Sequence, residues 1–263
     1  MDENESTCLL LGERRRKILE QVEIEERVTV EELAKRFGTS TVTIRGDLDA
    51  LAESGALVRT HGGAIRRLNP STDYPLNLRE TVHRAEKVRI GQAAAQLIRD
   101  GQTIILDSGT TTVEIARQIK FLNLKSITVI TNALNIAMEL ATLPNVSLIM
   151  LGGMLRQMPY ALVGPQAEQA LRDLNADHLF LGGYALDVQV GLMTPDMLEA
   201  QLNALMVRVS KEVTAVVDSS KFGQRSLSLI ARIDTLHRLI TDSKVDPQMV
   251  AQLRSRNLEV ILV

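Results

Sequence analysis

The chain has 263 residues, long enough for two domains, and 45% of them are hydrophobic, which supports a sizeable core. Its formal net charge of −2 leaves room for a basic face on one small domain but excludes a strongly basic chain. A single cysteine excludes an internal disulfide and fits a reducing compartment. No apolar run has the length and flanks of a signal peptide or a membrane span, so we expect a cytoplasmic protein with no membrane partner.

The first strong periodic signal is at residues 30–37, where apolar side chains recur at i, i+3, i+4 and i+7, the spacing of one buried helix face. Gly38 is expected to end this helix, because glycine tolerates the left-handed conformation that a tight turn requires. Ser40 or Thr41 then caps a second helix that runs to about residue 54. Two short helices joined by such a turn indicate a helix-turn-helix.

The second helix is predicted to have an apolar and a polar face. Val42, Leu48 and Leu51 can point inward, and Ile44 forms an i, i+4 pair with Leu48. Near the helix N-terminus the other face carries Thr41, Thr43 and Arg45. That end of a recognition helix meets base edges in the major groove.

A short hairpin follows once Gly55 stops the helix: strands at 57–60 and 64–67 flank a turn at 61–63. A hairpin beside a helix-turn-helix is typical of a winged DNA-binding domain. Arginines at 14–16, 45, 59, 66 and 67 would supply cations for phosphate contacts. The alternative is a small helical domain with a solvated charged face. The predicted DNA-binding residues are Ser40, Thr41, Thr43, Arg45, Arg59, His61 and Arg66.

The sequence divides into four parts. A flexible leader at 1–12 precedes the DNA-binding domain at 13–68. A linker is predicted at 69–80, since its first half is polar and holds two prolines, which interrupt both the helical and the strand pattern of apolar residues. The remainder, 81–263, is predicted to be a larger effector-sensing domain.

The larger domain alternates short apolar runs with helical stretches. Continuous apolar runs suit parallel strands buried on both faces, so the alternation predicts a mostly parallel α/β sheet. The predicted strands are 103–106, 127–130, 146–150, 178–181, 213–217, 236–240 and 260–263. The predicted helices are 84–99, 112–120, 133–141, 165–174, 197–210 and 247–256.

Ligands of such sheets bind beyond the carboxyl ends of the strands, where polar loops follow here. After the first strand, Gly109 allows close approach of a ligand, and the N–H groups at the start of the next helix suit phosphate. An ordinary Ser/Thr helix cap is the alternative. Asp218 can accept from a hydroxyl group, and Lys221 can neutralise phosphate. The predicted effector-binding loop residues are Asp107, Ser108, Gly109, Thr110, Thr111, Asn132, Gly153, Arg156, Asp218 and Lys221.

These motifs resemble those of the DeoR family of bacterial sugar-responsive repressors over nearly the whole chain, excepting the first dozen residues. The similar segments are 40–48, 55–64, 107–111, 131–132, 152–153, 199–200 and 218–222. The resemblance implies a repressor of sugar uptake or catabolism genes that a phosphorylated sugar releases from its operator. It implies an N-terminal winged helix-turn-helix and a C-terminal sensor similar in fold to sugar-phosphate isomerases and deaminases. It adds Glu199 to the effector-binding residues.

The similarity to isomerases raises an alternative function, a sugar-phosphate isomerase or deaminase with an accessory DNA-binding domain. That chemistry needs a general base beside the reacting carbons and a ring-opening acid. Tyr184 stands where the acid would be expected, and Asp187 comes too late, although Glu199 remains a possible base. We therefore expect a binding site without catalysis and no cofactor. The four histidines have no metal-ligand spacing, so no metal is expected.

The expected partners are double-stranded operator DNA, a phosphorylated sugar and further copies of the chain, as a homo-oligomer (dimer or tetramer). One winged helix covers too little duplex for tight specific binding. Gly46 departs from the family pattern, which usually has a basic or polar residue there. It removes one potential DNA contact and costs about 1 kcal/mol of helix stability relative to alanine.

Overall fold

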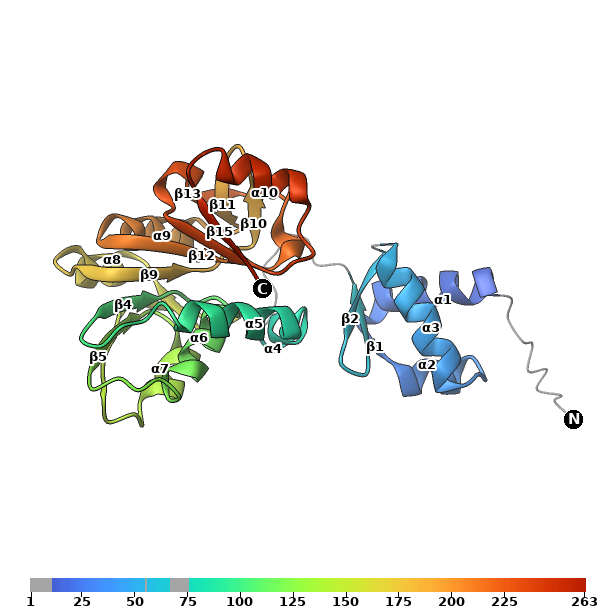
Figure 1. Ribbon diagram of the computed structural model, residues 1–263. Helices are drawn as coiled ribbons and strands as arrows, with labels where there is room; N and C mark the ends of the chain where they lie inside the picture. Colours follow the sequence, from blue (N-terminus) through green and yellow to red (C-terminus); the bar gives the residue numbers. More distant parts are fainter. Residues whose placement is uncertain (1–10, 55, 67–75) are drawn as a thin grey trace, which may run out of the picture. The chain divides into compact units, whose positions relative to one another are not determined.

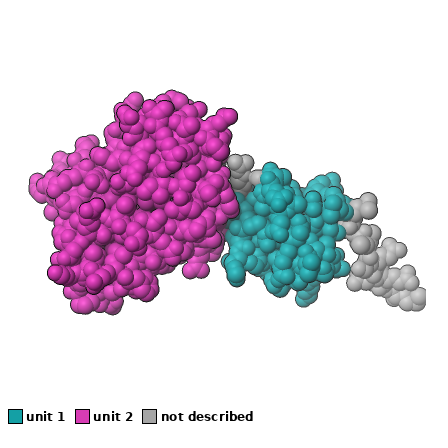
Figure 2. All heavy atoms as spheres, viewed as in Figure 1, with its two compact units in different colours: residues 1–69 teal, residues 70–263 magenta. Residues whose placement is uncertain are grey.

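The computed structural model describes residues 11–54, 56–66 and 76–263. They belong to two compact units, residues 1–69 and 70–263 (Figure 2). Most of the predicted leader (1–10), Gly55, Arg67 and the first half of the predicted linker (69–75) lie outside the described residues. The predicted linker extended to residue 80, but Leu76–Thr81 form helix α4, whose first N–H donates to the carbonyl of Met158 in the second unit.

The first unit is a three-helix core beside a small antiparallel sheet. Its helices are α1 (Leu11–Glu25), α2 (Val30–Arg36) and α3 (Thr41–Glu53). Its strands, β1 (Arg27–Thr29), β2 (Leu57–Thr60) and β3 (Gly63–Arg66), form a sheet in the order β1-β3-β2. Leu11 and Gly12, expected in the leader, begin α1. The predicted helix-turn-helix and hairpin are therefore present, with an additional helix and strand in front of them.

The two predicted helices start and stop as their sequences indicate. Thr29 and Glu32 form a reciprocal capping box at the start of α2, and Gly38 after its end has φ of +59°. Ser40 caps α3, since its Oγ accepts from the Thr43 N–H at 3.1 Å. Ile44 and Leu48 are fully buried among side chains of α1, α2 and the sheet.

The second unit is built on a seven-stranded, all-parallel sheet with strand order β15-β14-β12-β9-β4-β5-β6. Its strands match the predicted apolar runs to within a few residues: β4 (Thr103–Leu106), β5 (Ile127–Thr131), β6 (Val146–Met150), β9 (Ala176–Leu181), β12 (Ser210–Val216), β14 (Arg238–Thr241) and β15 (Glu259–Leu262). The helices are α5 (Arg84–Ala95), α6 (Thr112–Ile119), α7 (Leu134–Leu140), α8 (Pro165–Arg172), α9 (Met197–Arg208) and α10 (Pro247–Arg254).

Helices cover both faces of this sheet, and successive strand residues alternate between two apolar layers (Figure 1). On β4, Ile105 packs in the layer that contains α8, α9 and α10, whereas Ile104 and Leu106 pack in the layer of α5, α6 and α7. Phe180 of β9 belongs to the α5 layer and its neighbours to the other. Burial on both faces explains why these strands lack alternating polarity.

The periodic signals did not indicate the smaller elements of the second unit. Strands β7 (Met154–Arg156) and β8 (Ala161–Val163) form a hairpin. A second antiparallel sheet, β10-β11-β13, comprises β10 (Ala185–Asp187), β11 (Gly191–Thr194) and β13 (Ser228–Ala231). Strands of three or four residues are too short to show a period, so only tertiary contacts reveal them.

Candidate nucleic-acid interface and anion site

The N-terminal turn of α3 presents the predicted recognition residues at the surface. Ser40 is exposed, and its hydroxyl lies 2.9 Å from that of Thr43, which is half-buried like Thr41. Arg45 is exposed and makes no hydrogen bond or ion pair within the described residues. An exposed arginine without a partner on this helix is available for a base edge or a phosphate.

Val42 was predicted to point inward, and this is wrong: its side chain is 72% exposed. The helix buries Ile44, Leu48 and Leu51, and residue 42 lies on the opposite side of its first turn. Val42 therefore shares the outer surface with Arg45 and Gly46. An apolar side chain there is suited to contact the methyl group of thymine.

The hairpin arginines make intramolecular contacts as well as lying at the surface. Arg59 donates from Nε to Asp49 Oδ1 at 2.7 Å and from Nη1 to the carbonyl of Gly63, which ties the hairpin to α3. Arg66 lies 3.8 Å from Glu23. His61 is exposed at the hairpin turn. Arg59 thus fixes the hairpin relative to the recognition helix, and its predicted DNA contact stays a prediction.

The upstream arginines do not form the free cationic patch that the sequence suggested. Asp47, only 2% exposed, pairs through one oxygen with Arg14 and through the other with Arg15 at 3.0 Å. Arg14 is itself buried. This buried ion-pair network holds α1 against the recognition helix, so Asp47 has a structural role that its place in the motif did not reveal.

In the second unit, the carboxyl ends of five adjacent strands lie at one edge of the sheet. Polar residues follow four of them, Asp242 after β14, Asp218 after β12, Asp107 after β4 and Asn132 after β5, and Gly182 follows β9. Asp107 is buried and accepts the N–H of Gly109 at 3.0 Å and that of Gly182 at 2.9 Å. Burial raises the pKa of the Asp107 carboxyl. Asp107 therefore joins two ligand-facing loops to each other.

The loop after β4 is compact and its polar side chains are buried. Ser108, Thr110 and Thr111 are 4%, 6% and 6% exposed, and Thr111 makes no side-chain capping bond to α6. The simple helix-cap alternative is therefore not observed for Thr111. A Cβ on Gly109 would lie 3.0 Å from Asp107 Oδ1 and 3.0 Å from Thr112 Oγ1, so a larger residue would crowd this loop.

Two lysines and a histidine act on one carboxylate beside this loop. Burial raises the pKa of Asp218, but Lys221, Lys87 and His83 outweigh this and hold it below its usual value. Burial lowers the pKa of Lys221, and it lowers that of Lys87 to about 7. Lys87 donates to the carbonyl of Arg79 at 2.6 Å. Asp218 Oδ2 is buried without a hydrogen-bond partner. The surplus of positive side chains around one carboxylate makes this the candidate anion site.

Arg79 and Lys87 were not among the predicted site residues. Arg79 lies on α4 and donates to the hydroxyl of Tyr184 at 2.6 Å, with its guanidinium carbon 4.1 Å from the Tyr184 ring centroid. Its charge acts on Asp107, Glu199, Lys87 and Lys221. Lys87 could have been noticed in the sequence as a lysine on the buried face of the predicted helix α5. Only the fold, however, brings α4 and α5 to the carboxyl end of β12.

The hairpin β7–β8 supplies a second charged group. Arg156 pairs with Glu199 Oε2 and lies 3.3 Å from Asp196 Oδ2, at the start of α9. Burial raises the pKa of Glu199, against the lowering effect of Arg156. Asn132 donates to the Leu162 carbonyl at 3.1 Å, while its Oδ1 is buried without a partner. Gly153 has φ of +120°, and a Cβ there would lie 2.5 Å from the Val163 carbonyl oxygen.

The residues considered for catalysis are engaged elsewhere. The hydroxyl of Tyr184 accepts from Arg79, and Asp187 pairs with Arg225 at 2.6 Å near the surface. Glu199 is paired with Arg156. Among residues 11–54, 56–66 and 76–263, no three potential metal ligands come together, and no helix is long and apolar enough to cross a membrane.

A winged helix-turn-helix joined to an α/β domain with a candidate anion site defines a two-domain ligand-responsive DNA-binding protein. The chain belongs to the DeoR family: the DeoR-like helix-turn-helix domain matches residues 14–68, and the DeoR C terminal sensor domain matches residues 82–243. The resemblance inferred from the motifs is thus confirmed for both domains.

Relatives match over most of their length. A candidate repressor of the aga operon in Escherichia coli O157:H7 is 38% identical over 96% of this chain and 94% of the relative. The transcriptional regulator GlpR of Haloferax volcanii is 36% identical over 96% of this chain and 98% of its own. The transcriptional repressor AccR of Agrobacterium fabrum is 37% identical over 88% of this chain and 89% of the relative. These relatives carry the names of regulators, and the chain is a regulator of this family, not an enzyme.

Solved structures are similar only at a distance. Ribose 5-phosphate isomerase A of Methanocaldococcus jannaschii covers 53% of this chain with a TM-score of 0.39 and 17% identity, and the match spans 54% of that protein. Translation initiation factor eIF-2B of Pyrococcus horikoshii OT3 covers 85% of this chain and 70% of its own, with a TM-score of 0.45 and 16% identity.

Proposed function

We propose that this protein represses genes of sugar uptake or catabolism in the cytoplasm and that a phosphorylated sugar releases it from operator DNA. The observation that carries the effector part is the surplus of positive charge beside Asp218: Lys87 and Lys221 interact with this carboxylate, and the charge of Arg79 acts on both lysines. A phosphate monoester carries between −1.5 and −2 charges near pH 7 and would neutralise this surplus.

Two hydrogen-bond acceptors beside the proposed phosphate position suit the hydroxyl groups of a sugar. Asn132 has a buried amide oxygen without a partner, and Asp218 has a buried carboxylate oxygen without one. Buried polar atoms are nearly always hydrogen-bonded, so both oxygens would accept from ligand hydroxyls. Arg156 and Glu199 would contact the end of the sugar remote from the phosphate. The names of the aga and Ula regulators among the relatives support a carbohydrate effector.

Release follows from differential binding. The effector binds more tightly to a conformation or assembly in which the spacing of the DNA-binding domains does not match the operator. The free energy of operator binding is then weakened by the difference between the effector's binding free energies for the two states. Two copies of the recognition helix would have to reach successive half-sites about one helical turn apart, so the active species is a homo-oligomer, a dimer or a tetramer.

The experiment compares operator affinity with and without effector. A thermal-shift panel of sugar phosphates and their unphosphorylated sugars first identifies the effector, because a ligand of the native state must raise the melting temperature. Gel shifts with DNA from the neighbourhood of the gene then measure release. Lys221→Ala and Gly109→Asp should bind operator normally but fail to release it. Lys211→Ala is the matched control, because this lysine is exposed and paired with Asp177.

Normal release in both variants would mean that the anion is held elsewhere, and Arg156 would be examined next. Release by the unphosphorylated sugar would overturn the phosphate proposal. Turnover of ribose, glucosamine or galactosamine phosphate that Glu199→Gln abolishes would favour catalysis.

A further inference from the structure

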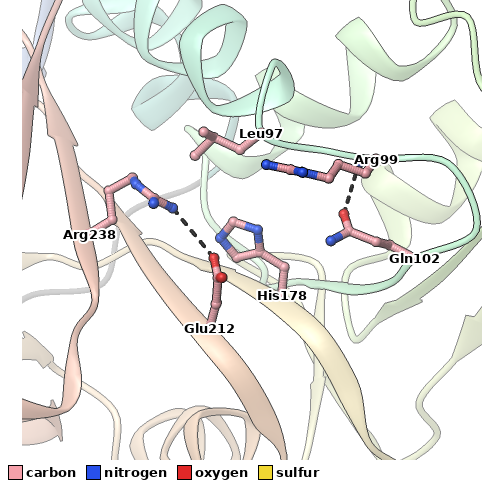
Figure 3. A pocket seen from close by; sticks show the side chains of 6 residues that line it. All are labelled: Leu97, Arg99, Gln102, His178, Glu212 and Arg238. Carbon is pink, nitrogen blue, oxygen red and sulfur yellow. Dashed lines mark hydrogen bonds and ion pairs between the residues drawn. The ribbon is translucent and has the colours of Figure 1, made fainter.

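A hollow of about 360 Å³ opens near the amino ends of the sheet strands, at the opposite edge from the anion site. Figure 3 shows the side chains that line it. The anion site includes residues that follow the strands, such as Asp218 and Lys221, whereas this hollow uses residues before or within the first three positions of the strands. It is lined by Leu97, Arg99, Gln102, His178, Glu212 and Arg238. It therefore cannot hold the same ligand molecule as the anion site.

Strand register explains why these side chains gather. His178 of β9 lies opposite Glu212 of β12, and Arg238 of β14 lies opposite Thr214. All four share the sheet face whose interior is covered by α5. Because α5 ends at Ala95, the amino end of that face is bounded instead by the turn at 99–102.

The turn is held firmly in place. The Arg99 N–H donates to Gln102 Oε1 at 2.8 Å, and the Gly101 N–H donates to the Ser126 carbonyl at 2.8 Å. The Thr103 N–H donates to Asp177 Oδ2 at 2.9 Å, which ties the turn to the start of β9. On one side, therefore, the wall of the hollow is the backbone of the turn at 99–102, which these hydrogen bonds hold in place.

His178 is the buried polar group of the hollow. Its side chain is 2% exposed, its Nε2 lies 2.7 Å from Thr214 Oγ1, and its ring stacks on Phe180 with centroids 4.1 Å apart. Nδ1 makes no hydrogen bond within the part of the chain that the structure describes. Burial lowers the pKa of His178 to about 4, so the ring is neutral at neutral pH and Nδ1 is free to donate or accept.

Further unused donors face the hollow from the turn. The Arg99 guanidinium makes no ion pair or hydrogen bond with any described residue. Gln102 uses its oxygen on the Arg99 backbone, which leaves its amide nitrogen free, and Figure 3 shows that nitrogen directed toward His178. Across the hollow, Arg238 lies 3.6 Å from Glu212 and 2.8 Å from Glu259. Donors therefore dominate one side, and a carboxylate lies on the other.

We propose that this hollow binds a small organic oxyanion that also carries a hydroxyl or amino group. The carboxylate or phosphate of the ligand accepts from Arg99, Gln102 and the Nδ1–H of His178, and the hydroxyl or amino group donates to Glu212. Charge-assisted hydrogen bonds to an otherwise unpaired guanidinium provide most of the affinity. The proposal concerns a second ligand site and does not depend on the sugar-phosphate effector.

The test observes histidine side chains by NMR in the full-length protein with labelled histidine. The chain has only four histidines, and two of them report on different sites: His178 on the hollow and His83, whose charge acts on Asp218, on the anion site. The probes are malate, a hydroxy-carboxylate, and inorganic phosphate, titrated separately. We expect a saturable shift of the His178 ring signals with at least one probe, and which probe acts tells carboxylate from phosphate.

The decisive variant is Arg99→Gln, which alters an exposed side chain and so should leave the fold intact. We expect it to weaken the His178 response roughly tenfold, whereas Arg89→Gln, another exposed arginine, should leave it unchanged. A response that does not saturate, an equal response in Arg99→Gln, or shifts confined to His83 would each overturn the proposal. The neutral diamide of malate should produce no shift, and a shift equal to that of malate would also contradict an oxyanion site.

Discussion

Arg156 on strand β7 and Glu199 on helix α9 form a buried ion pair that links the hairpin to the centre of the effector domain. The two side chains are 12% and 7% exposed, so neither charge has water to replace its partner. Breaking one half of a buried pair costs about 3–5 kcal/mol because it leaves the other charge uncompensated.

Arg156→Gln should therefore destabilise the protein, and the loss should depend on pH. Burial holds the pKa of Glu199 above its ordinary value of 4.5, and removal of the arginine raises it further. The folded state then binds a proton that the unfolded state releases, so stability falls as pH rises from about 4.5 through the folded-state pKa. Melting temperatures of variant and wild type should converge at acid pH. A constant difference across pH, or no rescue by adding Glu199→Gln, would contradict this account.

Arg45→Ala should weaken specific operator binding by about 1–3 kcal/mol without loss of stability, because the side chain is exposed and makes no hydrogen bond or ion pair within the described residues. Fluorescence anisotropy with the operator measures the change, and the dependence on salt separates a phosphate contact from a base contact. Arg36→Ala is the control, since that arginine, the last residue of α2, is already paired with Glu25. Equal effects of the two substitutions would remove Arg45 from the interface.

Asp47→Ala should unfold or loosen the DNA-binding domain, because Arg14 is buried and would lose its carboxylate. The expected loss is about 3–5 kcal/mol, within a domain of marginal stability. Asp49→Ala, at an exposed position on the same helix, should cost less than about 1 kcal/mol. Circular dichroism of the two variants during denaturation measures this, and similar midpoints would show that the Asp47 network contributes little.

Effector binding should take up protons near pH 8. Lys87 has its pKa lowered to about 7, so much of it is neutral at pH 8 in the free protein, and a nearby phosphate dianion would restore its proton. The phosphate itself is fully ionised there, since its second pKa is about 6. Calorimetric titration in buffers of different ionisation enthalpy counts the protons. Lys87→Met should abolish the uptake, and uptake of the same size in that variant would exclude Lys87 as its source.

The same pKa has a consequence for the free protein. Between pH 7 and the ordinary lysine pKa of 10.5, the unfolded chain holds a proton that the folded Lys87 has lost. The contribution of Lys87 to stability therefore rises with pH across this window and is absent below pH 7. Lys87→Met should flatten that rise in a series of thermal melts.

The sequence by itself determined the features that depend on short-range chemistry. Apolar runs placed each strand of the parallel sheet to within a few residues, because a strand buried on both faces must be apolar throughout. Ser40 was predicted as a cap, and Gly38 as a helix terminator, from their local backbone preferences. The common edge of the polar loops followed from the prediction of parallel strands, since parallel strands have their carboxyl ends at one edge of the sheet.

Only the tertiary structure decided which distant residues meet. Lys87 reaches Asp218 because α5 crosses the end of β12, and Arg79 reaches Tyr184 because α4 packs on the second unit instead of continuing the linker. Val42 faces outward because contacts with α1 and α2 set the rotation of α3 about its axis. The helical period in the sequence does not by itself decide whether residue 42 belongs to the buried face or to the surface beside it. Periodicity and capping act over a few residues, whereas contacts such as that of Arg79 with Tyr184, 105 positions apart, depend on how the helices cross the sheet.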